Sequence, residues 1–146
     1  MSESEAIDTT YTAFAADPAY VQANAAFVAR LPLAPVARIL DLCGGSGAVG
    51  QLMLAGATGA SLQAIDLDPV QIGLAAANYA DLGYEVRRNE QPFQQPPGPA
   101  RTVTLTVGSA TELPFPRATF DCVMIANAIH LIADKHGLIS QIASVL

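Results

Sequence analysis

A glycine-rich segment is the part of the sequence whose residue types are best suited to holding a ligand. Gly44, Gly45 and Gly47 follow the short apolar run 38–42. Glycine lets a ligand approach backbone N–H groups closely, and it accepts dihedral angles that other residues avoid. A tight connection between a strand and a helix, with no ligand, explains the same glycines. The segment alone therefore leaves both interpretations open.

An acidic residue at a defined distance favours the ligand-binding interpretation. Asp66 ends a second apolar run, 61–66, and lies 19 residues after Gly47. In nucleotide-binding folds, an acid about 20 residues after the glycine turn accepts hydrogen bonds from the ribose hydroxyls. The pair of features predicts that the chain binds a nucleoside.

The elements that must position these residues alternate between strand and helix. β-branched and apolar runs predict four strands, and periodic apolar stripes predict the helices between them. Asp68, Pro69 and Gly83 have the residue types of a helix cap, a first helical position and a helix stop. We expect strands at 38–42, 61–66, 102–107 and 120–126, and helices at 48–55, 69–82 and 135–145, with helical segments in 6–31 where Pro18 lies near a start.

Two further details concern the last helix and the longest loop. Asp134 is a candidate cap for the helix 135–145, with Leu138, Ile139, Ile142 and Val145 predicted on one face. The proline-rich segment 84–100 predicts a surface loop, in which only 84–88 has extended character. We therefore expect one α/β domain over 1–146 with a mostly parallel sheet, made of a helical lead-in at 1–35 and a core at 36–146.

Composition excludes several classes of protein. The 146 residues are 51% hydrophobic, which excludes a disordered chain, and the net charge of −6 disfavours nucleic acid and anionic membranes as partners. The N-terminus lacks the pattern of a signal peptide, and no apolar run reaches the roughly 18 to 20 residues of a membrane span. Cys43 and Cys122 do not have the spacing of metal ligands, so the sequence predicts a cytoplasmic protein with no metal site and no membrane segment.

Three segments resemble the motifs of class I S-adenosylmethionine-dependent methyltransferases. ILDLCGGSGAVG at 39–50 resembles motif I, commonly written LDxGxGxG, and AIDLDP at 64–69 resembles motif II. GSATELPFPRATFDCVMIANAIHLI at 108–132 is similar to the family pattern GDAxxLPFxxxxFDxVxxxxxLHHL. Cys43 replaces the first glycine of motif I, as alanine does in the related ubiquinone and menaquinone biosynthesis C-methyltransferases. The resemblance covers about residues 38–146.

The resemblance implies S-adenosylmethionine as the cofactor and assigns roles to individual residues. It places Gly45 and Gly47 against the cofactor, Asp66 on the ribose and Ala110 beside the adenine, with Ser109 standing where the family has an acid. Asp41 would either orient the turn or approach the methionine amino group, and a purely structural acid is an equal alternative. The predicted cofactor-binding residues are Asp41, Cys43, Gly44, Gly45, Gly47, Asp66, Leu67, Ser109, Ala110 and Asn127.

Side chains with reactive chemistry carry weaker predictions. His130 is the one candidate for a general base, although a packing residue is the favoured interpretation. Tyr11 and Tyr20 are candidates for aromatic lid residues, and exposed helix tyrosines explain them nearly as well. Cys43 is expected to be a small buried hydrophobic residue rather than a nucleophile.

The resemblance implies a Rossmann-like three-layer sandwich and transfer of a methyl group to a small-molecule acceptor. The family has seven strands and we find four here, so the sheet is expected to be incomplete. Relatives continue beyond the final IASVL into a proline-glycine turn and a fifth strand, so we expect a missing C-terminal segment or a homo-oligomer. Two alternatives are a non-catalytic or truncated binding module and an NAD(P)-binding oxidoreductase, which would require GxGxxG spacing.

Overall fold

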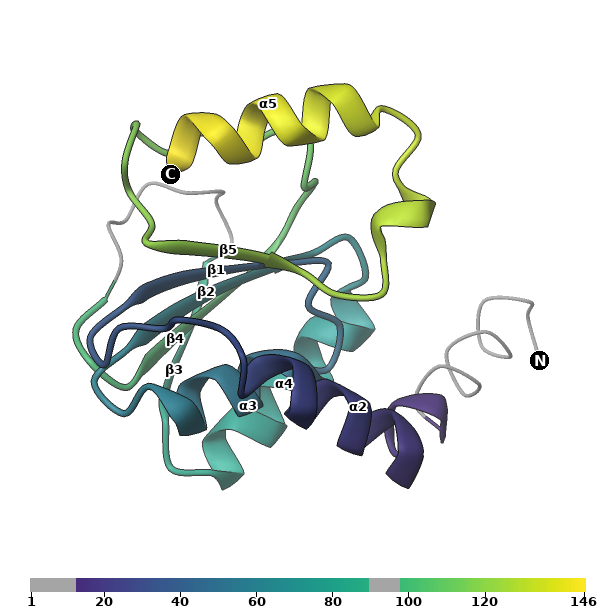
Figure 1. The fold of residues 1–146 in the computed structure, drawn as a ribbon, viewed down its shortest axis with the longest axis vertical. Coiled ribbons are helices and arrows are strands. Elements are labelled where there is room, and N and C mark those ends of the chain that lie inside the picture. Colours follow the sequence, from purple (N-terminus) through teal and green to yellow (C-terminus); the bar gives the residue numbers. More distant parts are fainter. Residues whose placement is uncertain (1–12, 90–97) are drawn as a thin grey trace.

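The computed structural model describes residues 13–89 and 98–146, which form three layers around a central sheet (Figure 1). The sheet has five strands, all parallel, in the order β3-β4-β2-β1-β5. Helices α2, α3 and α4 cover one face and α5 covers the other (Figure 1). The elements are α2 Pro18–Val28, β1 Arg38–Leu42, α3 Ala48–Gly56, β2 Ser61–Asp66, α4 Pro69–Asp81, β3 Glu85–Asn89, β4 Thr102–Val107, β5 Cys122–Ile125, the 3-10 turn η1 Ile129–Leu131 and α5 Lys135–Val145. This is the expected α/β sandwich with helices on both faces.

Strand β1 supplies side chains to two separate cores. Side chains alternate along a strand, so Ile39 points to the α3 and α4 face, while Leu40 and Leu42 point to the α5 face. Asp41 shares the face of Ile39, and its carboxyl is therefore directed into the layer of α3 and α4. This alternation decides the environment of the acid before any ligand is considered.

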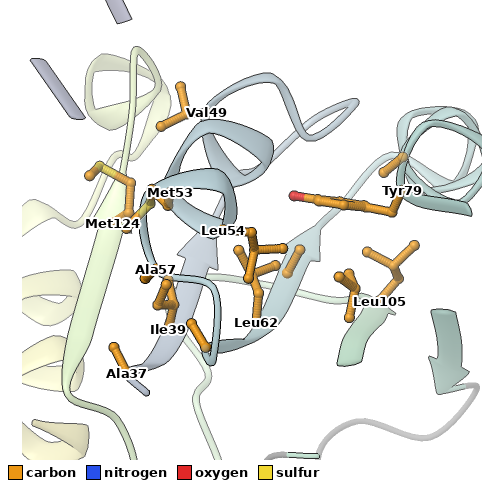
Figure 2. Packing of buried hydrophobic residues seen from close by; sticks show 14 of the residues in the cluster. Ala37, Ile39, Val49, Met53, Leu54, Ala57, Leu62, Tyr79, Leu105 and Met124 are labelled. Carbon is orange, nitrogen blue, oxygen red and sulfur yellow. The ribbon is translucent and has the colours of Figure 1, made fainter. Parts of the chain in front are cut away.

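The larger core lies between the sheet and α3 and α4. Met53 of α3 and Tyr79 of α4 pack over Ile39, Leu62 and Leu105 from three neighbouring strands (Figure 2). All five side chains are buried, and each contributes about 1.5–3 kcal/mol when removed from water. Tyr79 extends from α4 toward α3, where its ring fills the space below the glycine-rich turn (Figure 2).

The boundaries of α4 confirm the expected capping residues. The Asp68 carboxylate accepts a hydrogen bond from Val70 N–H at 2.9 Å, and Pro69 takes the first helical position. Gly83 has φ +85°, which is the left-handed conformation that follows many helix ends. The helix ends at Asp81, one residue before its expected end.

Helix α5 confirms its cap but not its whole apolar face. The Asp134 carboxylate accepts from Gly137 N–H at 2.8 Å. Leu138 and Val145 are fully buried against the sheet, whereas Ile139 is 53% exposed. The prediction was wrong for Ile139 because each helical residue turns by about 100°, which carries Ile139 away from the side of Leu138 that faces the sheet.

The expected number of strands was wrong, because the described residues contain five. Strand β3 occupies Glu85–Asn89, within the expected loop and close to the piece 84–88 for which extended character was predicted, and it pairs in parallel with β4. Its sequence EVRRN lacks an apolar pattern, since it forms the outer edge of the sheet and Arg88 remains exposed. Charged edge strands of this kind discourage pairing with other molecules.

The helical lead-in contains α2, which begins at Pro18 as expected. The Asp17 carboxylate caps it by accepting from Ala19 N–H at 2.9 Å. Phe14 and Phe27 are about half exposed, and the residues that α2 buries are Asn24 and Val28. Tyr11 lies outside the described residues. Within those residues, no helix has the length and apolar character needed to cross a membrane.

Candidate functional site

The turn between β1 and α3 is shaped by two buried side chains beneath it. A Cβ atom on Gly44 would lie 2.8 Å from Asp41 Oδ2, and one on Gly47 would lie 2.7 Å from Tyr79 Cε2. Gly47 also has φ +87°, a conformation that disfavours other residues. These two glycines are therefore required by close packing against Asp41 and Tyr79.

Asp66 connects the end of β2 to this turn. Its Oδ2 accepts a hydrogen bond from Gly45 N–H at 2.9 Å, and its Oδ1 accepts from Asp68 N–H at 2.9 Å. Each carboxylate oxygen has a second lone pair, so the group retains acceptor capacity for a ligand. The half-buried carboxylate therefore fixes the backbone of both loops and can still accept hydrogen bonds.

Asp41 is buried below the same turn. Its side chain is 1% exposed, and Oδ2 has no hydrogen-bond partner among the described residues. Burial raises the pKa of this carboxyl to about 7, and the negative charge of Asp66 raises it further. Near neutral pH, Asp41 is thus close to the midpoint of its titration.

A pocket of about 250 Å³ opens where the carboxyl ends of four strands meet. Successive parallel strands place their following loops at one edge of the sheet, which is where ligands bind in open α/β folds. The loops after β1, β2, β4 and β5 all contribute to the wall. The lining residues are Cys43, Gly45, Asp66, Leu67, Gln71, Gly108, Ser109, Ala110, Ala126, Asn127, Ala128, Leu131 and Ile132.

The loop after β4 supplies a hydroxyl where the family pattern has an acid. Ser109 Oγ lies 2.8 Å from Thr111 Oγ1 and accepts from Thr111 N–H at 3.2 Å. Ala110 beside it is buried. This corner of the pocket is therefore uncharged, with a small apolar wall next to the hydroxyl pair.

Asn127, in the loop after β5, links the pocket to the N-terminal helix. It has φ +59°, and its Nδ2 donates to the Tyr20 hydroxyl at 2.8 Å. Tyr20 also contacts Phe14 through their rings, with 4.5 Å between centroids. The structure thus brings one of the two candidate lid tyrosines to a pocket-lining residue, which sequence spacing alone did not require.

Cys43 lines the pocket in an unusual backbone conformation. Its φ is +53°, at the position where the family's motif has glycine. Burial raises the pKa of its thiol to about 11, with further contributions from Asp66 and Asp41. The thiol is therefore protonated at neutral pH and is a poor nucleophile.

Four predicted residues do not line the pocket. Asp41 lies beneath the turn, while Gly44 and Gly47 belong to the turn and pack against Asp41 and Tyr79, and none of the three is part of the pocket wall. His130 is exposed on η1, and its neighbour Leu131 is the residue that reaches the pocket wall. The segment resembling the family's LHHL thus presents an apolar side chain to the pocket.

Six lining residues were not predicted from the sequence. Gln71 belongs to the first turn of α4, and Leu131 and Ile132 belong to η1 and the residue after it. The apolar residues gave no separate signal, because a pocket wall and a protein core require the same residue types. The residues concerned are Gln71, Gly108, Ala126, Ala128, Leu131 and Ile132.

The described residues contain no group of three His, Cys, Asp or Glu side chains suited to a metal ion.

Comparison with solved structures shows the same fold in several proteins. The YcgJ protein from Bacillus subtilis is 17% identical with a TM-score of 0.66, over 86% of this chain and 46% of that one. A SAM-dependent methyltransferase from Aquifex aeolicus is 16% identical with a TM-score of 0.70, over 94% and 66%. The [4+2]-cyclase SpnF is 20% identical with a TM-score of 0.68, over 87% and 41%.

The chain spans about half the length of such solved relatives. No protein in a search of curated sequences matched it. A family model described as a methyltransferase domain matches residues 39–146, the part that contains the pocket and all of the sheet except its first residue, Arg38. The chain therefore belongs to the methyltransferase domain family.

Proposed function

We propose that the pocket binds S-adenosylmethionine and that the chain supports transfer of the cofactor's methyl group to a small-molecule acceptor. The observation that carries the proposal is the position of Asp66. Its carboxylate stands at the pocket edge, accepts Gly45 N–H at 2.9 Å and keeps lone pairs for two ribose hydroxyls. An acid at the end of the second strand of a glycine-turn fold suits a ribose in this way.

The other walls of the pocket fit the remaining parts of the cofactor. Ala110, Leu131 and Ile132 offer apolar surface for an adenine ring, and the hydroxyl of Ser109 can face its exocyclic amine. The pocket volume of about 250 Å³ is slightly below the range of about 300–1,000 Å³ for small-molecule sites, so the ends of the cofactor would extend beyond it. We assign Asp41 to holding the turn, since it lies behind Gly44 and outside the pocket wall.

Bound S-adenosylmethionine supplies a methyl group already activated by its sulfonium. The residues of this chain then have to align the acceptor and exclude water. Asn127 and Tyr20 bridge the pocket edge to α2 and would restrict access from that side. The protonated thiol of Cys43 does not compete with the acceptor as a nucleophile, because the thiolate is the reactive form.

The acidic net charge of −6 supports a small acceptor over nucleic acid.

Among the described residues β5 pairs only with β1, so its outer edge is free to pair with a further strand or a second copy. We therefore expect the chain to associate in solution. Sedimentation velocity tests this inference, and a purely monomeric species at all concentrations contradicts it.

Calorimetric titration with S-adenosylmethionine, S-adenosylhomocysteine and NAD is the experiment that tests the proposal. We expect saturable binding of the first two and none of NAD. Binding of NAD alone would overturn the assignment and favour an oxidoreductase.

A second candidate is a module that binds the cofactor without transferring its methyl group. It is favoured by the occurrence of this fold in a [4+2]-cyclase. Incubation with S-adenosylmethionine and a panel of phenols, amines and thiols separates the two. Release of S-adenosylhomocysteine that depends on an acceptor supports transfer, and binding without release supports the module.

A further inference from the structure

A second, larger cavity lies on the helical side of the glycine-rich turn. Its volume is about 410 Å³, within the range of about 300–1,000 Å³ common for small-molecule sites. Residues of α2, α3 and α4 line it, and α2 packs directly on α3. None of its lining residues lines the pocket at the strand ends, so the two cavities are separate.

The wall of this cavity contains a buried amide without a partner. Asn24 of α2 is 8% exposed, and its Nδ2 has no hydrogen-bond partner among the described residues. An unpaired buried donor costs about 1–3 kcal/mol, so such groups are rarely left unsatisfied in native proteins. A single water would satisfy it, but a water occupies only about 30 Å³, a small part of the cavity.

Two further side-chain amides belong to the wall of this cavity. Asn78 Nδ2 and Gln51 Nε2 both donate to the Ser46 carbonyl, at 3.1 and 3.4 Å. Each of these amides also has a carbonyl oxygen, which can accept a hydrogen bond. The rest of the lining is apolar, with Leu52 and Leu74 as its largest members, and no charged residue belongs to it among the described residues.

We propose that this cavity is a second ligand site that takes an uncharged small molecule carrying a carboxamide or a similar amide edge on an apolar body. An amide carbonyl can accept from Asn24 Nδ2, while an amide N–H₂ can donate to Gln51 or Asn78. A charged ligand would lose its hydration without finding an opposite charge in the wall. The site does not depend on what binds at the strand ends.

Benzamide, benzoate and benzamidine are suitable probes, because they share a shape and differ in charge. Binding to the full chain is followed by titration in two-dimensional NMR, with the side-chain amide of Asn24 and the backbone amide of Ser46 as reporters. We expect saturable shifts with benzamide, and at least about tenfold weaker binding of the two charged probes. Equal binding of all three, or no saturable shift with benzamide, overturns the proposal.

Two substitutions test the location. Asn24→Leu removes the unpaired donor and is expected to weaken benzamide binding about tenfold or more while raising the melting temperature. Leu74→Trp fills the cavity from α4 and is expected to abolish binding. Val70→Trp is the matched control, because Val70 is exposed on the same helix and outside the cavity. Unchanged binding in both Asn24→Leu and Leu74→Trp overturns the proposal.

A competition experiment separates this site from the pocket at the strand ends. Saturation with S-adenosylhomocysteine is expected to leave the benzamide-induced shift at Asn24 in place. Displacement of benzamide places it at the strand ends and contradicts the second site. If S-adenosylhomocysteine itself does not bind, the proposed cofactor is wrong, whereas the shift at Asn24 still reports on this cavity.

Discussion

The carboxyl ends of β1 and β2 lie side by side in the sheet and each carries an aspartate, yet the two acids have different environments. Asp41 in β1 points into the layer of α3 and α4, where it is 1% exposed and its Oδ2 has no partner. Asp66 in β2 is half-buried at the pocket edge, and both of its oxygens accept backbone N–H groups. Aspartate therefore has a different role at the end of each of these two neighbouring strands.

The difference follows from the direction of each side chain. Asp41 is buried close to Gly44 and Gly50, and this burial, together with the charge of Asp66, raises the pKa of its carboxyl to about 7. Asp66 is surrounded by backbone donors that stabilise a carboxylate. Burial thus keeps the carboxyl of Asp41 protonated up to a higher pH. The carboxylate of Asp66 instead holds two loops by hydrogen bonds and can bind a ligand.

The largest expected effect concerns the pH dependence of stability through Asp41. Its folded-state pKa, about 7, exceeds the ordinary aspartate value of 3.8, so the folded chain binds this proton more tightly than the unfolded chain. The stabilisation is complete below about pH 4 and is lost as the pH rises through 7. As the pH rises through that window, deprotonation of Asp41 should therefore lower the free energy of unfolding by up to about 4 kcal/mol.

Urea unfolding of the parent and Asp41→Asn, at several pH values from 4 to 8, measures this effect. The amide does not titrate, so the variant should show a flatter dependence on pH whatever its absolute stability. A parent and variant with parallel profiles would mean that Asp41 is ionised throughout.

The next effect concerns cofactor affinity through Asp66. Charge-assisted hydrogen bonds to ribose hydroxyls are worth roughly 1.5–3 kcal/mol each, so Asp66→Ala should weaken S-adenosylhomocysteine binding by about tenfold or more. The variant should also lose stability, because Gly45 N–H and Asp68 N–H lose their acceptor. Calorimetric titration measures the affinity, corrected for the folded fraction.

Asp68→Ala is the matched control for Asp66→Ala. The Asp68 carboxylate caps α4 by accepting Val70 N–H, so its removal should lower stability by about 1 kcal/mol with little change in affinity. Normal affinity in Asp66→Ala together with weakened affinity in Asp68→Ala would show that Asp68, and not Asp66, contacts the ribose.

A smaller effect is expected from Cys43→Gly. Cys43 has φ +53°, a conformation that costs about 1–2 kcal/mol for a residue with a side chain. Glycine removes that cost but adds about 0.5–1 kcal/mol of unfolded-state entropy, so the variant should gain up to about 1 kcal/mol. Cys122→Gly, the same change within β5, should lose stability instead. Thermal unfolding of both variants measures their stability. A loss of stability in both would contradict a strained conformation at Cys43.

The smallest effect is expected from Ser109→Asp in the loop after β4. A carboxylate makes a stronger hydrogen bond to an amine than a hydroxyl does, by about 1 kcal/mol, so S-adenosylhomocysteine should bind about fivefold more tightly. Asp can also preserve the turn by accepting Thr111 N–H, as Ser109 Oγ does. Weaker binding in this variant would place the adenine away from Ser109.

Local chemistry explains what could be predicted from the sequence. Asp68, Pro69 and Gly83 identified α4 because capping, proline and left-handed glycine act within a few residues of the chain. The apolar runs gave β1, β2 and β4 at their observed bounds. The order of motifs gave the Rossmann-like fold and seven of the pocket-lining residues, because loops after parallel strands gather at one sheet edge.

Contacts between distant residues decided the rest. Strand β3 exists because β4 offers it backbone hydrogen bonds, although its own sequence is polar. The role of Asp41 depends on which face of β1 it occupies, and Gly47 is required by Tyr79, about 30 residues away along the chain. Asn24 lies in an alanine-rich helix and is buried there only because α2 packs on α3. The sequence specified the elements and their order through short-range physics, whereas burial and partners depend on packing that only the tertiary structure brings together.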